Sequence, residues 1–325
     1  MRTFPFSHLS SNLLQLLLYS FNYSTSNYPN YPQVKLVSKI TKKMPVSMLI
    51  HFFPHSQLTR SASGGKWLHA LVFNLFNRIS PEYAEYIHRQ YDYKLFTLSP
   101  LRTKGKEHEI EEGQLCHVRL TLLDDQKISE LLCILAEIDQ QELRLGNTTI
   151  SIYNVQVSPE TNNIWVRYQS WEELVESPPK EFINLQWHSP TAIKQQHRNS
   201  LFPIPETIFY SWQKRWLKIS PIPLPQELTP DDWFTSSQIS SYNLQTTTVY
   251  FGNFKQKGFN GKASYEIYGD DNIKKTANIL SHFAFYCGTG YKTTIGMGQT
   301  NITSKSLDFS KDNNQPTNSN ENPNI

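Results

Sequence analysis

The chain has 325 residues, of which 38% are hydrophobic and 18% charged, enough to build the cores of two ordinary domains. An apolar run near the N-terminus, residues 13–21, is shorter than the roughly 18 residues that a membrane-spanning helix needs. That run follows a single basic residue and no cleavage site is evident, so neither a secretory signal nor a membrane partner is expected. Three well-separated cysteines fit neither a disulfide framework nor a zinc cluster, and they predict a cytoplasmic protein.

The net charge of +3 conceals an uneven distribution. Residues 1–43 hold five of the 31 basic residues and none of the 28 acidic ones, which leaves 26 basic against 28 acidic residues in the rest. A body with almost no net charge binds a polyanion only where its basic residues cluster. Such a cluster lies between residues 180 and 218, and its candidate contacts are Lys194, Arg198, Lys214 and Arg215, together with Lys180 and Lys218.

Two segments are too polar to fold, and they flank the part of the chain with regular patterns. Residues 1–43 predict a disordered extension or a start codon assigned too early, and residues 305–325 predict a disordered tail. Between them, the Pro-Pro pair at 178–179 marks a hinge. The predicted domains are therefore residues 44–178 and residues 179–304.

The first of these domains has the order β-α-β-β-α-β, which is typical of a ferredoxin-like fold. Apolar alternation predicts strands, apolar residues three or four apart predict helices, and Ser80 before Pro81 predicts a helix start. The expected elements are a strand at 46–53, helices at 66–77 and 82–90, strands at 94–99 and 114–123, a helix at 125–138 and a strand at 148–157.

The second domain repeats the pattern more loosely, so the predicted fold is α+β with two tandem ferredoxin-like units. Ile208, Trp212 and Trp216 recur every four residues, and this spacing predicts that both tryptophans face a core rather than stack on bases. The expected elements are a strand at 182–187, a helix around these three residues, strands at 246–254 and 262–268, a helix at 270–286 and a closing strand after a glycine-rich loop.

The glycine-rich loop is the most informative segment of the chain. It holds four of the thirteen glycines, and its candidate ligand contacts are Gly288, Gly290, Tyr291, Lys292, Gly296 and Gly298. Backbone amides exposed by glycine, together with one lysine, suit a phosphate group. The spacing lacks the third glycine of a dinucleotide fingerprint and the lysine of a P-loop. A glycine-rich turn before the last strand is the alternative interpretation.

Four segments occur in an order that is typical of one protein family. They are Gly288-Thr-Gly-Tyr-Lys-Thr-Thr-Ile-Gly-Met-Gly298 and residues 81–99, 189–194 and 201–209. This set resembles the CRISPR-associated endoribonucleases that cut precursor CRISPR RNA within its repeats, the sixth of the Cas families, in the RAMP superfamily. The resemblance covers residues 46–304. It implies two RRM-like domains, CRISPR repeat RNA as the partner and proteins of a CRISPR effector complex as further partners, and it leaves a homodimer open.

The resemblance also implies candidate catalytic residues. Some members of the family cleave with a histidine, a lysine six residues later and a tyrosine fifteen residues before the histidine. His88 and Lys94 match the first two positions, whereas Phe73 occupies the third and has no hydroxyl group. The expected roles are general base for His88 and electrostatic stabiliser for Lys94, and no metal or other cofactor is needed. His69, in the first predicted helix, is the alternative base.

The implied reaction is attack by the RNA's own 2′-OH on the adjacent phosphate, which leaves a 2′,3′-cyclic phosphate and a 5′-OH. Histidine suits the proton transfers because it titrates near neutral pH. Several alternatives stay open at this point. His88 also fits a solvated histidine near a helix end, and Phe73 favours a non-catalytic RAMP-type subunit that holds guide RNA. A cellular RRM-like protein of RNA metabolism is a further alternative.

Overall fold

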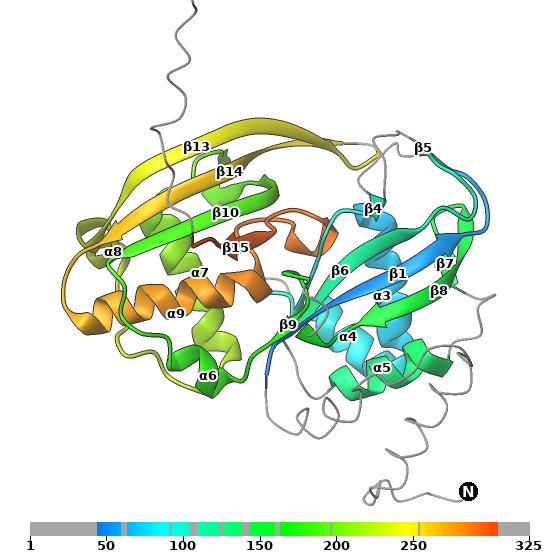
Figure 1. The fold of residues 1–325 in the computed structure, drawn as a ribbon, viewed down its shortest axis with the longest axis horizontal. Coiled ribbons are helices and arrows are strands. Elements are labelled where there is room, and N and C mark those ends of the chain that lie inside the picture. Colours follow the sequence, from blue (N-terminus) through cyan, green and yellow to red (C-terminus); the bar gives the residue numbers. More distant parts are fainter. Residues whose placement is uncertain are drawn as a thin grey trace, which may run out of the picture.

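The computed structural model describes residues 44–59, 64–90, 93–103, 109–123, 127–137, 143–159, 163–195, 197–252 and 254–304. Two antiparallel sheets lie next to each other, with helices packed against them (Figure 1). The architecture is α+β with tandem ferredoxin-like units, which confirms the predicted fold class. The predicted terminal segments 1–43 and 305–325 lie outside the described residues.

The first sheet has the strand order β3-β6-β1-β8-β7, so the first strand of the chain lies in its middle, as in a ferredoxin-like unit. Between α3 and α4, Ser80 accepts a hydrogen bond from the backbone N–H of Tyr83, and Pro81 follows it, as the sequence predicted. The elements of this half are β1 (Val46–Pro54), β2 (Leu58–Thr59), α3 (Gly65–Ile79), α4 (Pro81–Arg89), β3 (Phe96–Leu98), β4 (Arg102–Thr103), β5 (Glu109–Ile110), β6 (Cys116–Leu122), α5 (Ile128–Glu137), β7 (Leu143–Leu145), β8 (Thr148–Gln156) and β9 (Arg167–Tyr168).

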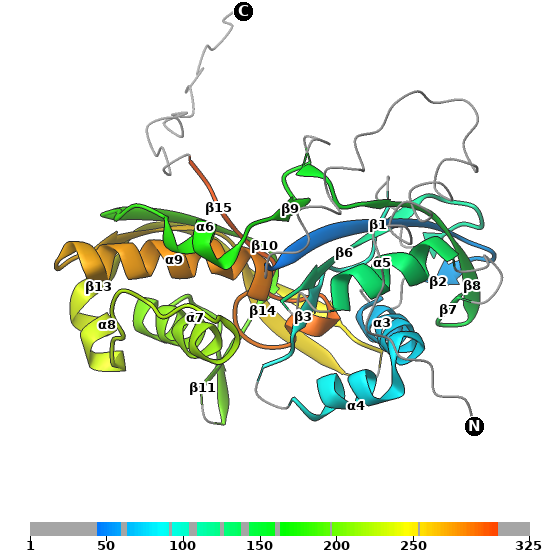
Figure 2. The same ribbon diagram turned by 90° about the horizontal axis from the view of Figure 1, so that it is seen from below.

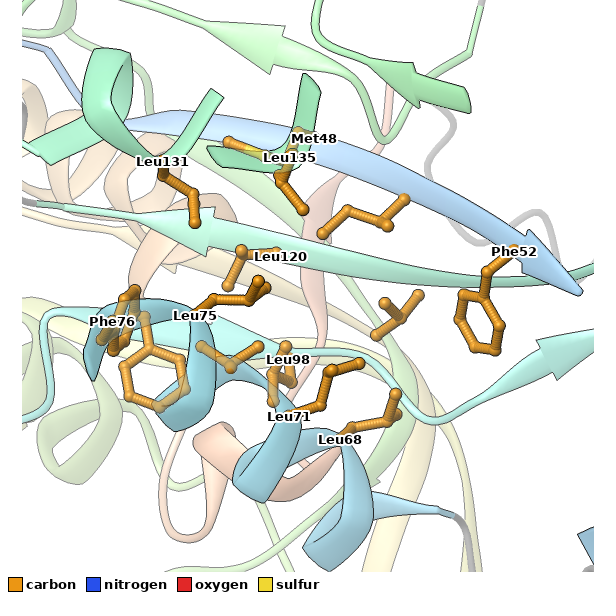
Figure 3. Close-up of a cluster of buried hydrophobic side chains, with 14 of the residues drawn as sticks. Met48, Phe52, Leu68, Leu71, Leu75, Phe76, Leu98, Leu120, Leu131 and Leu135 are labelled. Atoms are coloured by element: carbon orange, nitrogen blue, oxygen red, sulfur yellow. The ribbon is translucent and has the colours of Figure 1, made fainter. Parts of the chain in front are cut away.

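The core of this half lies between α3, α5 and the sheet. Leu68, Leu71 and Leu75 follow one face of α3 and are buried. They belong to the same apolar cluster as Met48 of β1 and Leu120 of β6 (Figure 3). Burial stabilises the fold by about 1.5–3 kcal/mol for each side chain of this size. The packing therefore holds α3 on the sheet and fixes where its remaining side chains lie.

The second sheet has the order β13-β14-β10-β15, again with the first strand of the unit in the interior. Trp212 and Trp216 of α7 are fully buried in its core with Trp233, which confirms the prediction that both face a core. The elements of this half are α6 (Trp171–Val175), β10 (Phe182–Thr191), β11 (Ile193–Gln195), β12 (Arg198–Ser200), α7 (Pro205–Ile219), α8 (Pro230–Ser236), β13 (Ser237–Tyr250), β14 (Lys255–Ile267), α9 (Asp271–Cys287) and β15 (Thr300–Ile302).

The hairpin of β13 and β14 is longer than the sequence predicted. The predicted strand at 246–254 was wrong at both ends, since β13 begins at Ser237 and the chain reverses after Tyr250. β13 is an edge strand, and many of its consecutive residues are exposed, so it lacks the apolar alternation that marks a half-buried strand. At the tip of the hairpin, Phe251 is buried against Ala192 and Met297, next to the glycine-rich loop.

Candidate functional site

The glycine-rich loop leaves the C-terminal end of α9 and returns the chain to β15. Its four glycines all have positive φ. At Gly298, φ is 72° and an added Cβ would lie 2.2 Å from the carbonyl oxygen of Thr289; at Gly290, it would lie 2.3 Å from that of Ala192. Only glycine fits such positions. The packing of the loop therefore accounts for its glycines, and three of them are buried: Gly288, Gly296 and Gly298.

Several backbone amides of the loop are used inside the protein. The N–H groups of Thr289 and Tyr291 donate to the carbonyl oxygens of Gly298 and Ala192, at 2.9 and 2.8 Å. That leaves side chains as the prominent features of the loop surface. Tyr291 is exposed and Lys292 is half-exposed, so these two side chains are the parts of the loop best placed to meet a ligand.

Arg215 is half-buried rather than on an exposed basic face, and its role as a nucleic-acid contact stays a prediction. The side chain is half-buried, and its guanidinium donates to the carbonyl oxygens of Cys287 at 2.6 Å and Gly290 at 2.7 Å. The last carbonyls of a helix have no partner within the helix and lie at its negative end, so they attract a cation. Arg215 therefore holds the end of α9 and the start of the loop, next to Trp212, whose indole N–H donates to the Gly288 carbonyl.

The other predicted basic contacts are exposed. Lys194 and Arg198 lie on the two strands of the small hairpin β11–β12. Lys214 lies on α7 with its ammonium 4.8 Å from the ring centre of Tyr210. These three side chains are accessible to a polyanion, and their role as RNA contacts stays a prediction.

Lys292 has two unusual features. Its φ of 60° makes it the one non-glycine residue with positive φ in the described ranges, a conformation that disfavours side chains. Its ammonium lies 3.6 Å from the ring centre of Phe254, and the ammonium of Lys66 lies 4.9 Å from the same ring. Burial lowers the pKa of Lys292, and the charge of Lys66 lowers it further. The sequence did not single out Lys66, because nothing local links the start of α3 to a loop more than 200 residues away.

His69 joins α3 to the loop. Its Nδ1 lies 3.2 Å from the carbonyl oxygen of Thr294, and its ring packs 4.7 Å from that of Phe73. Figure 2 shows the same part of the loop lying next to β3 and α3. Burial lowers the pKa of His69, and the charges of Lys94 and His88 lower it further, against the opposing effect of the Thr294 hydrogen bond. The neutral ring then carries its proton on Nδ1, since a carbonyl oxygen only accepts, and Nε2 keeps a free lone pair.

His88 lies at the exposed C-terminal end of α4. The rings of Phe73 and His88 pack nearly perpendicular to each other, with centres 5.8 Å apart, so Phe73 contacts both His69 and His88. The ammonium of Lys94 donates to the carbonyl oxygens of Ile87 at 2.9 Å and of His88 at 2.7 Å. Burial lowers the pKa of Lys94. Lys94 thus caps α4 and fixes the backbone of His88.

The structure brings together residues that the sequence treated separately. Two histidines and one lysine from the first half gather near a loop of the second half, in a surface that also carries Lys66 and Lys292. Cationic groups outnumber carboxylates here, and neither of the last two ammonium groups forms an ion pair with a described residue. Such a surface has general acid–base groups beside uncompensated positive charge, the arrangement that phosphate-ester chemistry requires.

Comparison with known proteins agrees with this geometry. Residues 44–176 match the model of the CRISPR Cas6 N-terminal domain, and residues 185–300 match that of the CRISPR-associated endoribonuclease Cas6. A Cas6 endoribonuclease of Streptococcus thermophilus is 24% identical over 227 residues, which are 69% of this chain and 86% of that protein.

Solved structures add a similarity of fold. A Thermus thermophilus Cas6 product complex is 26% identical, with a TM-score of 0.70, over 80% of this chain and all of that one. A structure described as an RAMP protein binding different RNA substrates is 11% identical, with a TM-score of 0.52, over 79% of this chain and 99% of that one, and shows likeness of fold alone.

The fold thus defines an α+β protein with two tandem ferredoxin-like units. The two family models together span most of the chain, and the protein belongs to the family of CRISPR-associated endoribonucleases named Cas6. It is an endoribonuclease of CRISPR RNA processing, as the sequence predicted. Within the described residues, no helix has both the length and the apolar character to cross a membrane.

Proposed function

We propose that this protein cleaves CRISPR repeat RNA once in each repeat by metal-independent attack of the 2′-OH next to the scissile phosphate. The products would be a 2′,3′-cyclic phosphate and a 5′-OH. The observation that carries the proposal is the cluster of His69, His88 and Lys94 beside the glycine-rich loop. RNA supplies its own nucleophile, so the protein needs a base, an acid and positive charge around the phosphate, and this cluster offers all three.

The two histidines differ in a way that divides the proton transfers between them. A general base must be unprotonated at the working pH, and the lowered pKa of His69 together with its Nδ1–H contact leaves Nε2 ready to accept a proton. His69 therefore takes the proton of the 2′-OH. His88 is exposed, packs against Phe73 as well, and delivers a proton to the leaving 5′-oxygen. This assignment moves the base role from His88, where the sequence put it, to His69, and gives His88 the acid role that the sequence left open.

Positive charge near the phosphate comes from lysines. Lys94 acts mainly through the backbone of His88, which it fixes, and its charge adds to the field at the histidines. Lys292 and Lys66 both lie against the ring of Phe254, and no carboxylate among the described residues pairs with either. A backbone phosphate of the RNA supplies the counter-charge. The strained backbone of Lys292 is in keeping with this role, since strain is retained where a side chain is needed.

The decisive experiment is cleavage of the cognate repeat RNA in excess EDTA, with analysis of fragment length and end groups. We expect wild type to give one cut with a cyclic phosphate end. His69→Ala and His88→Ala should each lose about 10²–10⁴-fold in single-turnover rate while still binding RNA. His55→Ala is the matched control, because His55 is exposed and its ring hydrogen-bonds Thr149 and Ser151 of β8, away from the cluster of His69, His88 and Lys94.

Each alternative gives a different result. If His69→Ala cuts at the wild-type rate, the assignment of the base to His69 is wrong and His88 serves both proton transfers. If wild type binds the repeat without cutting it, Phe73 in place of a tyrosine was the decisive feature. The protein would then be the guide-RNA-holding subunit that the sequence left as its alternative.

A further inference from the structure

Arg119 is a buried cation at the junction of the two halves. It lies on β6, is 2% exposed, and extends toward the second half of the chain. Its Nε donates to the hydroxyl of Ser47 at 2.7 Å, Nη1 to the side-chain oxygen of Gln299 at 2.6 Å, and Nη2 to the carbonyl oxygen of Phe285 at 2.6 Å. The guanidinium also lies 4.1 Å from the ring centre of Phe285 and 4.9 Å from that of Trp165. No described carboxylate forms an ion pair with it.

A buried guanidinium without an acidic partner is costly, and apolar side chains often fill such a space at lower cost. Burial lowers the pKa of Arg119 to about 9, so the side chain is still cationic at neutral pH. Its compensation comes from the end of α9, where unpaired carbonyls and the negative end of the helix dipole meet the cation. Arginine is therefore favoured at this position by its geometry, because the planar guanidinium donates to three acceptors in fixed directions.

Two of the three acceptors, Phe285 and Gln299, flank the glycine-rich loop. Phe285 precedes the loop in the last turn of α9, and Gln299 follows it directly. Gln299 is itself tied to the first half, because its side-chain NH₂ donates to the carbonyl oxygen of Leu98 at 2.9 Å. One guanidinium from the first sheet thus holds both ends of a loop that belongs to the second half.

The same loop contacts the candidate base. Thr294, whose carbonyl oxygen orients His69, lies in the sequence between Phe285 and Gln299, the two residues beside the loop that Arg119 bonds. We infer that Arg119 is a positioning residue: it sets the glycine-rich loop against α3 and β3, so that Thr294 orients His69 and the loop presents the phosphate to both histidines. This inference rests on the proposed ribonuclease function, and it assigns to Arg119 no contact with RNA.

Arg119→Lys tests the inference, because lysine keeps the charge and loses the fork. We expect its single-turnover cleavage rate to fall about 10- to 100-fold, since a misplacement of about 1 Å can cost that much. Its affinity for a repeat RNA with a 2′-deoxy sugar at the scissile position should stay within about twofold of wild type. Arg144→Lys, an exposed arginine on β7, is the matched control and should change neither value. A wild-type rate in Arg119→Lys, or an equal loss of rate and affinity, would overturn the inference.

A second measurement does not depend on cleavage. Cys287 is buried at the end of α9, where the loop begins, and Cys116 is buried in the first core. Alkylation of the folded protein, read by mass spectrometry, should modify Cys287 at least about fivefold faster in Arg119→Lys than in wild type, while Cys116 stays protected. Equal acceleration at both thiols would indicate general loosening and contradict a positioning role.

The two measurements also separate this inference from the proposed function. If wild type cuts no RNA, the ribonuclease proposal fails, and the alkylation of Cys287 still shows whether Arg119 holds the loop. If Cys287 stays as protected in Arg119→Lys as in wild type, Arg119 does not hold the loop and the inference is wrong.

Discussion

Gly298→Ala provides a quantitative test of the loop geometry. An added Cβ would lie 2.2 Å from the carbonyl oxygen of Thr289, and φ at this position is 72°. A left-handed conformation costs an L-residue roughly 1–2 kcal/mol. Relief of the clash must also displace the hydrogen bonds that Gly298 makes with Thr289 at 2.9 Å and with Pro190 at 3.1 Å. Loss of one such buried bond costs about 1–3 kcal/mol.

The sum of these effects is a loss of about 2–5 kcal/mol in the free energy of unfolding. Gly252→Ala is the matched control, because its φ of 76° is similar and no atom of the described residues lies within 4 Å of an added Cβ. It should lose only the conformational part, about 1–2 kcal/mol. Urea unfolding followed by tryptophan fluorescence measures both values. If Gly298→Ala is no less stable than Gly252→Ala, the loop is not packed as described, and the reasoning about its glycines is refuted.

Three further predictions concern charged groups. Lys292→Gly should stay within about 1 kcal/mol of the wild-type free energy of unfolding, because the loss of the cation–π contact and the relief of backbone strain offset each other. The slope of log affinity for RNA against log salt concentration should fall by about 0.7 in this variant, and an unchanged slope would show that Lys292 contacts no phosphate. Lys94→Met should lose about 1–2 kcal/mol in the free energy of unfolding, since the carbonyl oxygens of Ile87 and His88 lose their donor. Chemical unfolding of this variant, compared with Lys127→Met as the control, measures the loss. Burial lowers the pKa of His282 to about 4, and the charges of Lys180 and Arg167 contribute to the shift. Between pH 6.5 and 4 the unfolded chain therefore binds more protons than the folded protein, so the free energy of unfolding falls as the pH falls through that window. His282→Gln should remove about 3 kcal/mol of that loss, and an identical pH dependence in the variant would contradict the assignment.

Local patterns were enough for the fold class and for most of the elements. The spacing of Leu68, Leu71 and Leu75 predicted the buried face of α3, and Ser80 before Pro81 predicted the start of α4. These features depend on residues a few positions apart, whose period and capping chemistry are fixed by helix geometry. The edge hairpin β13–β14 was predicted poorly for the opposite reason, because an exposed ribbon places no apolar alternation in the sequence.

Within the site, the sequence identified residue types, and the tertiary structure decided which of them meet. Arg215 follows a basic pattern but faces the end of α9, and its direction depends on how α7 and α9 pack. His69 and Thr294 are 225 residues apart in the sequence. The ammonium groups of Lys66 and Lys292 both contact the ring of Phe254, which is also far from Lys66 in the sequence.

The sequence by itself determined the two ferredoxin-like units, the buried tryptophans and the glycines that the loop requires, because each follows from local spacing or backbone conformation. Only the tertiary structure placed the loop against α3, oriented His69 and buried Arg119 between the halves. The docking of two sheets depends on the shapes of complete packed surfaces, which no short stretch of sequence contains.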